Sequence, residues 1–135
     1  METKAPVRIY MTRKLIGVSP DDTVKKACGI MVDFDIGSLV VVEDGKVVGF
    51  FTKSDIIRRV VIPGLPNDTP VKEIMTKDLV AVDVNAPLRE VLDLMAKKSI
   101  KHMLIEENGE IVGVFSLTDL LTASRRKLET AIAAE

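Results

Sequence analysis

Two stretches decide the fold: Gly49-Phe50-Phe51-Thr52-Lys53-Ser54-Asp55-Ile56-Ile57 and Gly113-Val114-Phe115-Ser116-Leu117-Thr118-Asp119-Leu120-Leu121. In each stretch a glycine and an apolar run lead to a hydroxyl residue, and an aspartate follows three positions later. The second stretch lies 64 positions after the first, and the same shift aligns residues 7–57 with residues 71–121 without a gap. Self-similarity at a fixed spacing indicates a tandem duplication.

The duplication predicts four segments. These are a first repeat at residues 7–61, a linker at 62–70, a second repeat at 71–125 and a C-terminal helical extension at 126–135. Three prolines in the linker forbid a continuous helix there. The extension has apolar residues at Leu128, Ala131 and Ile132. It is equally compatible with a surface for a second subunit and with a solvated tail.

Each repeat begins with a short strand and a helix. The strands are predicted at residues 15–18 and 79–82, and the polar turns after them place Asp21 and Asn85 as helix caps. The helices have apolar residues at the spacing of one buried face: Val24, Ala27, Cys28 and Met31, then Leu88, Val91, Leu92 and Met95. Because Cys28 aligns with Leu92, a packed thiol is expected rather than a reactive one.

A hairpin and a second helix complete each repeat. Strands are predicted at 39–42 and 47–51, and at 103–105 and 111–115, because Asp44-Gly45 and Asn108-Gly109 favour tight turns between them. The last helix of each repeat starts at Thr52 or Ser116. We expect the following apolar residues to face the core: Ile56, Ile57, Val60, Leu120, Leu121 and Ala123.

The order β-α-β-β-α in both repeats predicts an α+β fold with a sandwich-like arrangement of helices and sheets. A repeat of about 60 residues buries too little apolar surface for comfortable stability. We therefore expect the copies to share a core and to form one module with pseudo-two-fold symmetry.

Composition excludes several classes of function. The net charge is −1 and aromatic residues make up only 4% of the chain, so nucleic-acid binding is disfavoured. One cysteine and one histidine provide neither a disulfide nor a zinc cluster, and no apolar run is long enough to cross a membrane. The expectation is a soluble, cytoplasmic protein. No catalytic triad, zinc-ligand spacing, Walker-type loop or dinucleotide fingerprint is present, so we do not expect an enzyme.

The two opening stretches resemble the ends of two CBS motifs, and the pair resembles a Bateman module. Val7-Arg8-Ile9-Tyr10-Met11-Thr12 and Val71-Lys72-Glu73-Ile74-Met75-Thr76 are similar to the opening of the same family, so the likeness covers residues 7–125. The resemblance implies two related clefts between the motifs. It also implies an adenosine-containing ligand such as AMP, ADP, ATP or S-adenosylmethionine, and pairing into a homodimer. A chain of this size resembles the stand-alone members, which regulate a partner on another polypeptide.

The hydroxyl-x-x-Asp pattern has two physical interpretations. A hydroxyl residue at a helix start leaves free backbone N–H groups for a phosphate, and an aspartate one turn later can accept hydrogen bonds from a ribose. The same spacing forms a capping box within the chain itself. Lysines and arginines on these helices are candidates to meet a phosphate, but they can equally be solvated or stabilise a helix C-terminus.

Carried over from the family, Asp55 and Asp119 would hold ribose hydroxyls, and Thr52, Ser54, Ser116 and Thr118 would meet ribose or phosphate oxygens. Adenine would lie against backbone at residues 16–18 and 80–82. The complete set of predicted ligand-binding residues is Ile16, Gly17, Val18, Ser38, Thr52, Ser54, Asp55, Arg58, Arg59, Val80, Ala81, Lys101, His102, Met103, Ser116, Thr118 and Asp119.

The sequence thus favours a regulatory module that binds an adenosyl ligand, needs no metal or other cofactor, and modulates a partner that the sequence does not identify. The alternative is a structural or interaction dimer without a ligand. Lys101 and His102 add positive charge at the second repeat, where the first has Gly37 and Ser38. We therefore expect Asp119 to contribute more to binding than Asp55.

Overall fold

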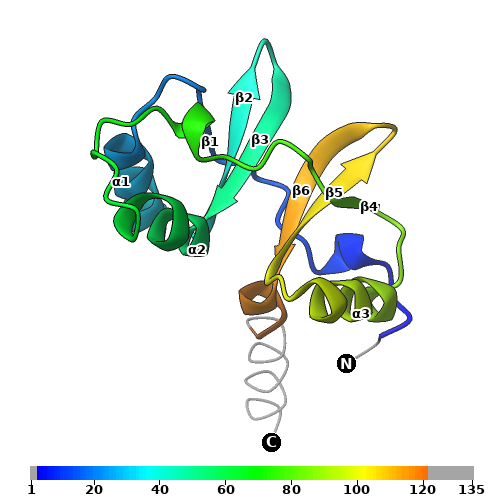
Figure 1. Ribbon diagram of the computed structural model, residues 1–135. Helices are drawn as coiled ribbons and strands as arrows, with labels where there is room; N and C mark the ends of the chain where they lie inside the picture. Colours follow the sequence, from blue (N-terminus) through cyan, green and yellow to red (C-terminus); the bar gives the residue numbers. More distant parts are fainter. Residues whose placement is uncertain (1–2, 122–135) are drawn as a thin grey trace, which may run out of the picture. The chain divides into compact units, whose positions relative to one another are not determined.

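The computed structural model describes residues 3–121, and its contacts divide the chain into two compact units (Figure 1). Residues 15–79 form one of them, which we call the continuous unit. The described residues 3–14 and 80–121 form the other, which we call the split unit. Each unit contains a three-stranded sheet and helices, which confirms the α+β class.

The continuous unit is built on the sheet β1-β2-β3. Strand β1 runs parallel to β2, and β2 runs antiparallel to β3. The elements in chain order are β1 (Gly17–Val18), α1 (Val24–Phe34), β2 (Ser38–Glu43), β3 (Lys46–Thr52), α2 (Lys53–Ile56), the π-helix η2 (Ile57–Val61) and the 3-10 helix η3 (Val71–Glu73).

The split unit repeats this arrangement with the sheet β4-β5-β6. Again the first pair of strands is parallel and the second is antiparallel. Its elements are the 3-10 helix η1 (Val7–Ile9), β4 (Ala81–Asp83), α3 (Leu88–Lys98), β5 (His102–Glu107) and β6 (Glu110–Ser116). Residues 117–121 are helical and end the described part of the chain. Within residues 3–121, no helix has both the length and the apolar character that a bilayer span requires.

Both predicted hairpins are present, and their turns have the predicted chemistry. Asp44 and Gly45 have φ of 52° and 76°, and Asn108 and Gly109 have φ of 53° and 81°. Positive φ at both central residues is what a two-residue hairpin turn requires, and aspartate, asparagine and glycine tolerate it best. The turn sequences therefore fix the hairpin register.

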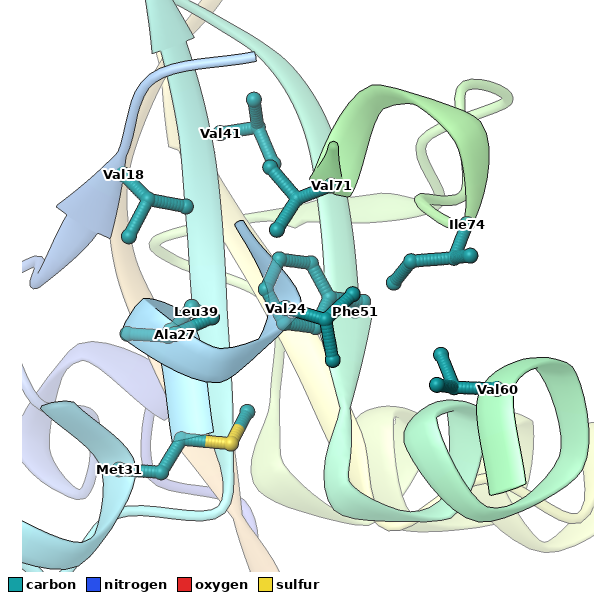
Figure 2. Close-up of a cluster of buried hydrophobic side chains, with 10 residues drawn as sticks. All are labelled: Val18, Val24, Ala27, Met31, Leu39, Val41, Phe51, Val60, Val71 and Ile74. Carbon is teal, nitrogen blue, oxygen red and sulfur yellow. The ribbon is translucent and has the colours of Figure 1, made fainter. Parts of the chain in front are cut away.

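One apolar cluster fills the space between the sheet and the helices of the continuous unit (Figure 2). Leu39 and Val41 alternate along β2 and point to this face, while α1 contributes Ala27 and Met31. Cys28 packs against the cluster, and burial raises the pKa of its thiol. This is the packed cysteine that its alignment with Leu92 predicts. The split unit has an equivalent cluster around Phe115 and Leu88.

Each core contains residues from both sequence repeats. Val71 and Ile74, which open the second repeat, are 0% and 2% exposed within the cluster of the continuous unit. Val7, which opens the first repeat, is 0% exposed in the cluster of the split unit. The repeats therefore share their cores by exchanging opening segments.

The exchanged segments also pair with the free edge of each sheet. Thr76 exchanges two backbone hydrogen bonds of 2.8 and 3.0 Å with Phe50 of β3, and Thr12 does the same with Val114 of β6. Next to these pairs, Gly49 and Gly113 lie under methionines 75 and 11, and an added Cβ would come within 3.0 Å of each sulfur. Glycine is thus required by close packing at these two positions.

The predicted helix caps are wrong. The N-cap of α1 is Thr23, whose hydroxyl accepts from the Lys26 N–H at 3.1 Å, and the N-cap of α3 is Pro87 without a side-chain cap. Asp21 instead forms an ion pair with Lys72. Asn85 accepts a hydrogen bond of 3.3 Å from Arg8.

Two residues expected in the cores are exposed: Ile57 by 55% and Leu121 by 70%. The core side of the last helix is set by Ile56 and Val60, which are four positions apart, so a residue one position after Ile56 lies outside that face. Ala123 and the extension at 126–135 lie outside the described residues.

We predict that Gly113→Ala lowers the free energy of unfolding by about 1–3 kcal/mol, the usual cost of overpacking. An added Cβ would lie 2.9 Å from both the Met11 sulfur and the Thr12 carbonyl oxygen, and the backbone oxygen cannot rotate away. Urea unfolding followed by circular dichroism measures the change.

Gly29→Ala is the matched control, because an added Cβ at this helical position meets nothing within 4 Å. It should raise stability by about 0.5–1 kcal/mol through helix propensity. Equal effects of the two substitutions would contradict the close-packing role of Gly113.

Candidate functional site

The first hydroxyl-x-x-Asp sequence lies where β3 passes into α2. The Asp55 carboxylate accepts the Thr52 backbone N–H through Oδ2 at 2.9 Å, and the Asp55 N–H donates to the Thr52 hydroxyl at 3.3 Å. These reciprocal bonds form a capping box. They fix the carboxylate at the helix start.

The second copy has the same geometry at the end of β6. The Ser116 N–H donates to Oδ2 of Asp119 at 2.9 Å, and the Asp119 N–H donates to the Ser116 hydroxyl at 3.2 Å. The hydrogen bonds of the capping interpretation therefore exist at both positions. These bonds use Oδ2 of each carboxylate. The oxygen of interest for ligand binding is therefore the other one, Oδ1.

The two Oδ1 atoms have different partners. In the split unit, the Thr12 hydroxyl donates to Oδ1 of Asp119 at 3.2 Å. In the continuous unit, Nη2 of Arg59 lies 3.7 Å from Oδ1 of Asp55. One acid is thus met by a neutral hydroxyl and the other by a guanidinium.

Strand pairing brings two further predicted residues beside the helix starts. Ser38 of β2 pairs with Thr52, and His102 of β5 pairs with Ser116. Both side chains are partly exposed. Each unit therefore gathers a hydroxyl, an acid and a second polar side chain at one end of its hairpin.

The residues predicted to face adenine lie on or beside β1 and β4, which are separated from β3 and β6 by the central strand of each sheet. Gly17 pairs with Val40 and Ala81 pairs with Leu104, so β1 and β4 occupy the opposite edge from β3 and β6. Val18 is 5% exposed, belongs to the apolar cluster and pairs with Val41 of β2, so its side chain is committed to packing.

The remaining predicted residues fall into three groups. Ile16 is half-buried, and Val80 is 40% exposed. Met103 is 1% exposed within its core, so its side chain is committed to packing. The exposed polar members are Ser54, Arg58, Lys101 and Thr118.

Sequence reasoning missed two groups that contact the acids or their partners. Thr12 reaches Asp119 because residues 11–12 pair with β6, and the Ile74 carbonyl accepts a 2.8 Å hydrogen bond from Arg59 because residues 71–76 lie beside β3. The matched Met-Thr pairs at the repeat openings were the available signal. These pairs supported the family resemblance, but they did not indicate that Thr12 lies at the candidate site.

A shallow hollow of about 570 Å³ lies elsewhere on the continuous unit, and none of the predicted ligand-binding residues lines it. Asp21 and Lys72 form an ion pair of 2.8 Å there, and the hydrogen bond that Lys72 donates to the Asp21 carboxylate raises the pKa of Lys72. Both side chains are more than half exposed, so the pair contributes little to stability. The lining residues are Pro20, Asp21, Glu43, Lys72, Glu73, Met75 and Lys77.

Comparison with known proteins identifies relatives over most of the chain. The CBS domain family model matches residues 7–62 and 71–126. The CBS domain-containing protein YhcV of Bacillus subtilis (strain 168) is 34% identical over 114 residues, which are 84% of this chain and 81% of that protein.

Solved structures agree with this match. An uncharacterized conserved protein from Pyrococcus horikoshii is 61% identical, with a TM-score of 0.90 over 93% of this chain and 96% of that chain. A crystal structure of a CBS domain with 29% identity has a TM-score of 0.81 over 88% of this chain and 96% of that one.

We predict that Thr52→Ala and Ser116→Ala each lower the free energy of unfolding by about 1 kcal/mol, because each removes the oxygen that accepts a helix N–H. Ser54→Ala is the control, since Ser54 is exposed and the change should stay within about 0.5 kcal/mol. Chemical denaturation of the three variants gives the comparison. If all three have the same stability, the capping bonds do not stabilise the helix starts.

Proposed function

The chain belongs to the CBS-domain family, and we propose that it is a regulatory module that binds an adenosine-containing ligand and modulates a protein partner. The ligand class is AMP, ADP, ATP or S-adenosylmethionine. We place its ribose at the aspartates of the two helix starts. The module needs no metal or other cofactor in this proposal, and it regulates rather than catalyses.

The two oxygens of each aspartate have different bonding partners, and this difference supports the proposal most directly. Oδ2 of Asp119 is held by the Ser116 N–H, so the carboxylate is fixed before any ligand arrives. Among residues 3–121, the group that the structure shows at Oδ1 is the Thr12 hydroxyl. A preorganised acceptor of this kind can take a hydrogen bond from a ribose hydroxyl at little cost in side-chain entropy.

The polar residues beside the acid suit the rest of a nucleotide. His102 pairs with Ser116 across the hairpin, and Lys101 precedes it on an exposed turn. The Leu117 N–H at the helix start donates to the Lys101 carbonyl, which joins this turn to the helix. A cationic side chain and a helix start on the same end of the sheet favour an anionic group such as phosphate.

A ligand can signal only if it binds one arrangement of the protein better than another. The exchanged opening segments offer a direct route, because Thr12 belongs to the opening of the first repeat and contacts the acid of the second. A ribose at Asp119 would compete with or add to that contact. Ligand binding would therefore change how tightly the opening segment is held.

We also propose that the chain forms a homodimer through the outer faces of its helices. Apolar side chains are exposed on α1 and after α2, including Val32 by 78%, Val61 by 66% and Ile62 by 75%. Both helices use their other faces for the core of the continuous unit. Large apolar side chains exposed on a small protein favour an interaction surface. This surface also supports the alternative of an interaction module without a ligand.

We predict that AMP, ADP, ATP or S-adenosylmethionine raises the thermal midpoint of the wild-type protein, and that Asp119→Asn removes about half of the shift or more. A ligand at one hundred times its dissociation constant adds about 2.7 kcal/mol of stability. The asparagine keeps an oxygen to accept the Ser116 N–H but lacks the charge, so binding should weaken about tenfold or more while folding is preserved. Thermal-shift and calorimetric titrations provide both readouts.

Asp55→Asn is the matched variant, and we expect it to weaken binding less than Asp119→Asn. If no member of the panel shifts the midpoint of the wild-type protein, the alternative of a ligand-free interaction module replaces the proposal. Equal losses in the two variants would contradict the ranking of the acids.

We predict that sedimentation equilibrium gives twice the mass of one chain, and that Val61→Glu shifts the protein towards the monomer by placing a charge in the apolar surface. Ile9→Glu is the control, because Ile9 is 59% exposed on η1 of the split unit. A monomeric wild-type protein at micromolar concentration would refute the dimer. An equal decrease in the measured mass of Val61→Glu and Ile9→Glu would also refute the dimer surface.

A further inference from the structure

The Arg59 side chain joins two segments of the continuous unit. Its Nη1 donates a 2.8 Å hydrogen bond to the backbone carbonyl of Ile74, and its Nη2 lies 3.7 Å from Oδ1 of Asp55. We call these two contacts the Arg59 clamp. The Ile74 carbonyl holds the guanidinium in place. The cation therefore lies near Oδ1 of Asp55, the oxygen that the capping box does not use.

At the position aligned with Arg59, the split unit has no arginine. The shift that relates the repeats aligns Arg59 with Ala123, whose methyl group has no donor. The acid of that unit, Asp119, receives the Thr12 hydroxyl at 3.2 Å instead. Two carboxylates with the same capping geometry therefore differ in the group that faces Oδ1.

This difference changes what a ribose would encounter. A hydroxyl is a neutral partner that can rotate, and it can both donate and accept, so it can remain beside a third hydrogen-bonding group. A guanidinium offers only donors and no acceptor to a ribose hydroxyl, and its charge attracts the carboxylate oxygen that the hydroxyl would contact. A ribose at Asp55 must displace the cation or share the oxygen with it.

We propose that Arg59 is a specificity-determining residue that lowers the affinity of the Asp55 position for a nucleoside, so that the Asp119 position fills first. This inference rests on the proposed adenosyl-binding function and assigns a structural cause, the Arg59 clamp, to the order of the two positions. The clamp is weak enough to open. Arg59 is 44% exposed and Asp55 is 21% exposed, and pairs with this exposure contribute only modestly.

The sequence analysis assigns Arg59 the opposite role, as a contact for the phosphate of a ligand. In that role, loss of the arginine weakens binding, and it does so only for ligands that have a phosphate. In the clamp role, loss of the arginine tightens binding with or without a phosphate. The two roles therefore differ in sign and in their dependence on the ligand.

The test measures adenosine and AMP binding by calorimetry in an Asp119→Asn background, which isolates the Asp55 position. Arg59→Gln is the main variant, because its amide can still donate to the Ile74 carbonyl while the charge is removed. Arg59→Ala removes both contacts. Arg89→Gln is the matched control, since Arg89 is an exposed arginine of α3 outside the predicted ligand-binding set and its substitution removes the same charge.

We expect Arg59→Gln and Arg59→Ala to tighten adenosine and AMP binding by about two- to fivefold, the range that corresponds to an exposed ion pair. Arg89→Gln should change the affinity for neither ligand by that factor. Denaturation curves for each variant establish that folding is intact. If Arg59→Ala is too unstable to titrate, the affinity of Arg59→Gln alone tests the proposal.

Two results would overturn this inference while leaving the proposed function in place: unchanged affinity in both Arg59 variants, or weaker binding of AMP with unchanged binding of adenosine. The second result would assign Arg59 to the phosphate. If the wild-type protein binds neither adenosine nor any member of the nucleotide panel, the proposed function fails and this inference fails with it.

Discussion

The structure depends on the packing of each repeat's opening segment against the sheet of the other repeat. Residues 71–76 close the apolar cluster of the continuous unit and pair with the edge of β3. Without them, Phe51 and Leu39 would lose part of the cover that keeps them at 0% and 1% exposure. An uncovered strand edge would also present unpaired N–H and C=O groups. Gly49 provides the room for this contact, because only a residue without a Cβ lets the Met75 side chain approach β3 so closely.

Much of this fold could be predicted from local signals. The hairpins follow from turn residues that accept positive φ, and the buried faces of α1 and α3 follow from apolar spacing. Local signals are weaker where two candidates compete for one role. Asp21 and Thr23 both suit a helix cap, and only the backbone hydrogen bond to Thr23 decides between them. The exchange of opening segments has no local signal at all, because it depends on contacts between residues far apart in the chain.

The candidate site also has one part that local signals predict and another part that depends on long-range contacts. The spacing of hydroxyl and acid predicted where Thr52, Asp55, Ser116 and Asp119 lie, and their capping bonds are local. The partners of the second carboxylate oxygen are not equally local. One of them, Thr12, is 107 positions away from Asp119. A capping box and a ligand site also share the same residues, so the sequence pattern alone does not separate them. What distinguishes the copies is the neighbour of Oδ1: Arg59 is only four positions from Asp55, whereas the tertiary structure brings Thr12 to Asp119.

The boundary between the units has a consequence for the order in which the chain assembles. The continuous unit spans residues 15–79, so all of its parts leave the ribosome before the last strands of the split unit exist. The split unit must wait, because the Val7 N–H bonds to the Ala86 carbonyl and closes a loop of about 80 residues. Closing a loop costs less entropy when its interior is already compact than when it is a free coil. Early folding of the inserted unit would therefore bring the N-terminus within reach of the strands that arrive last.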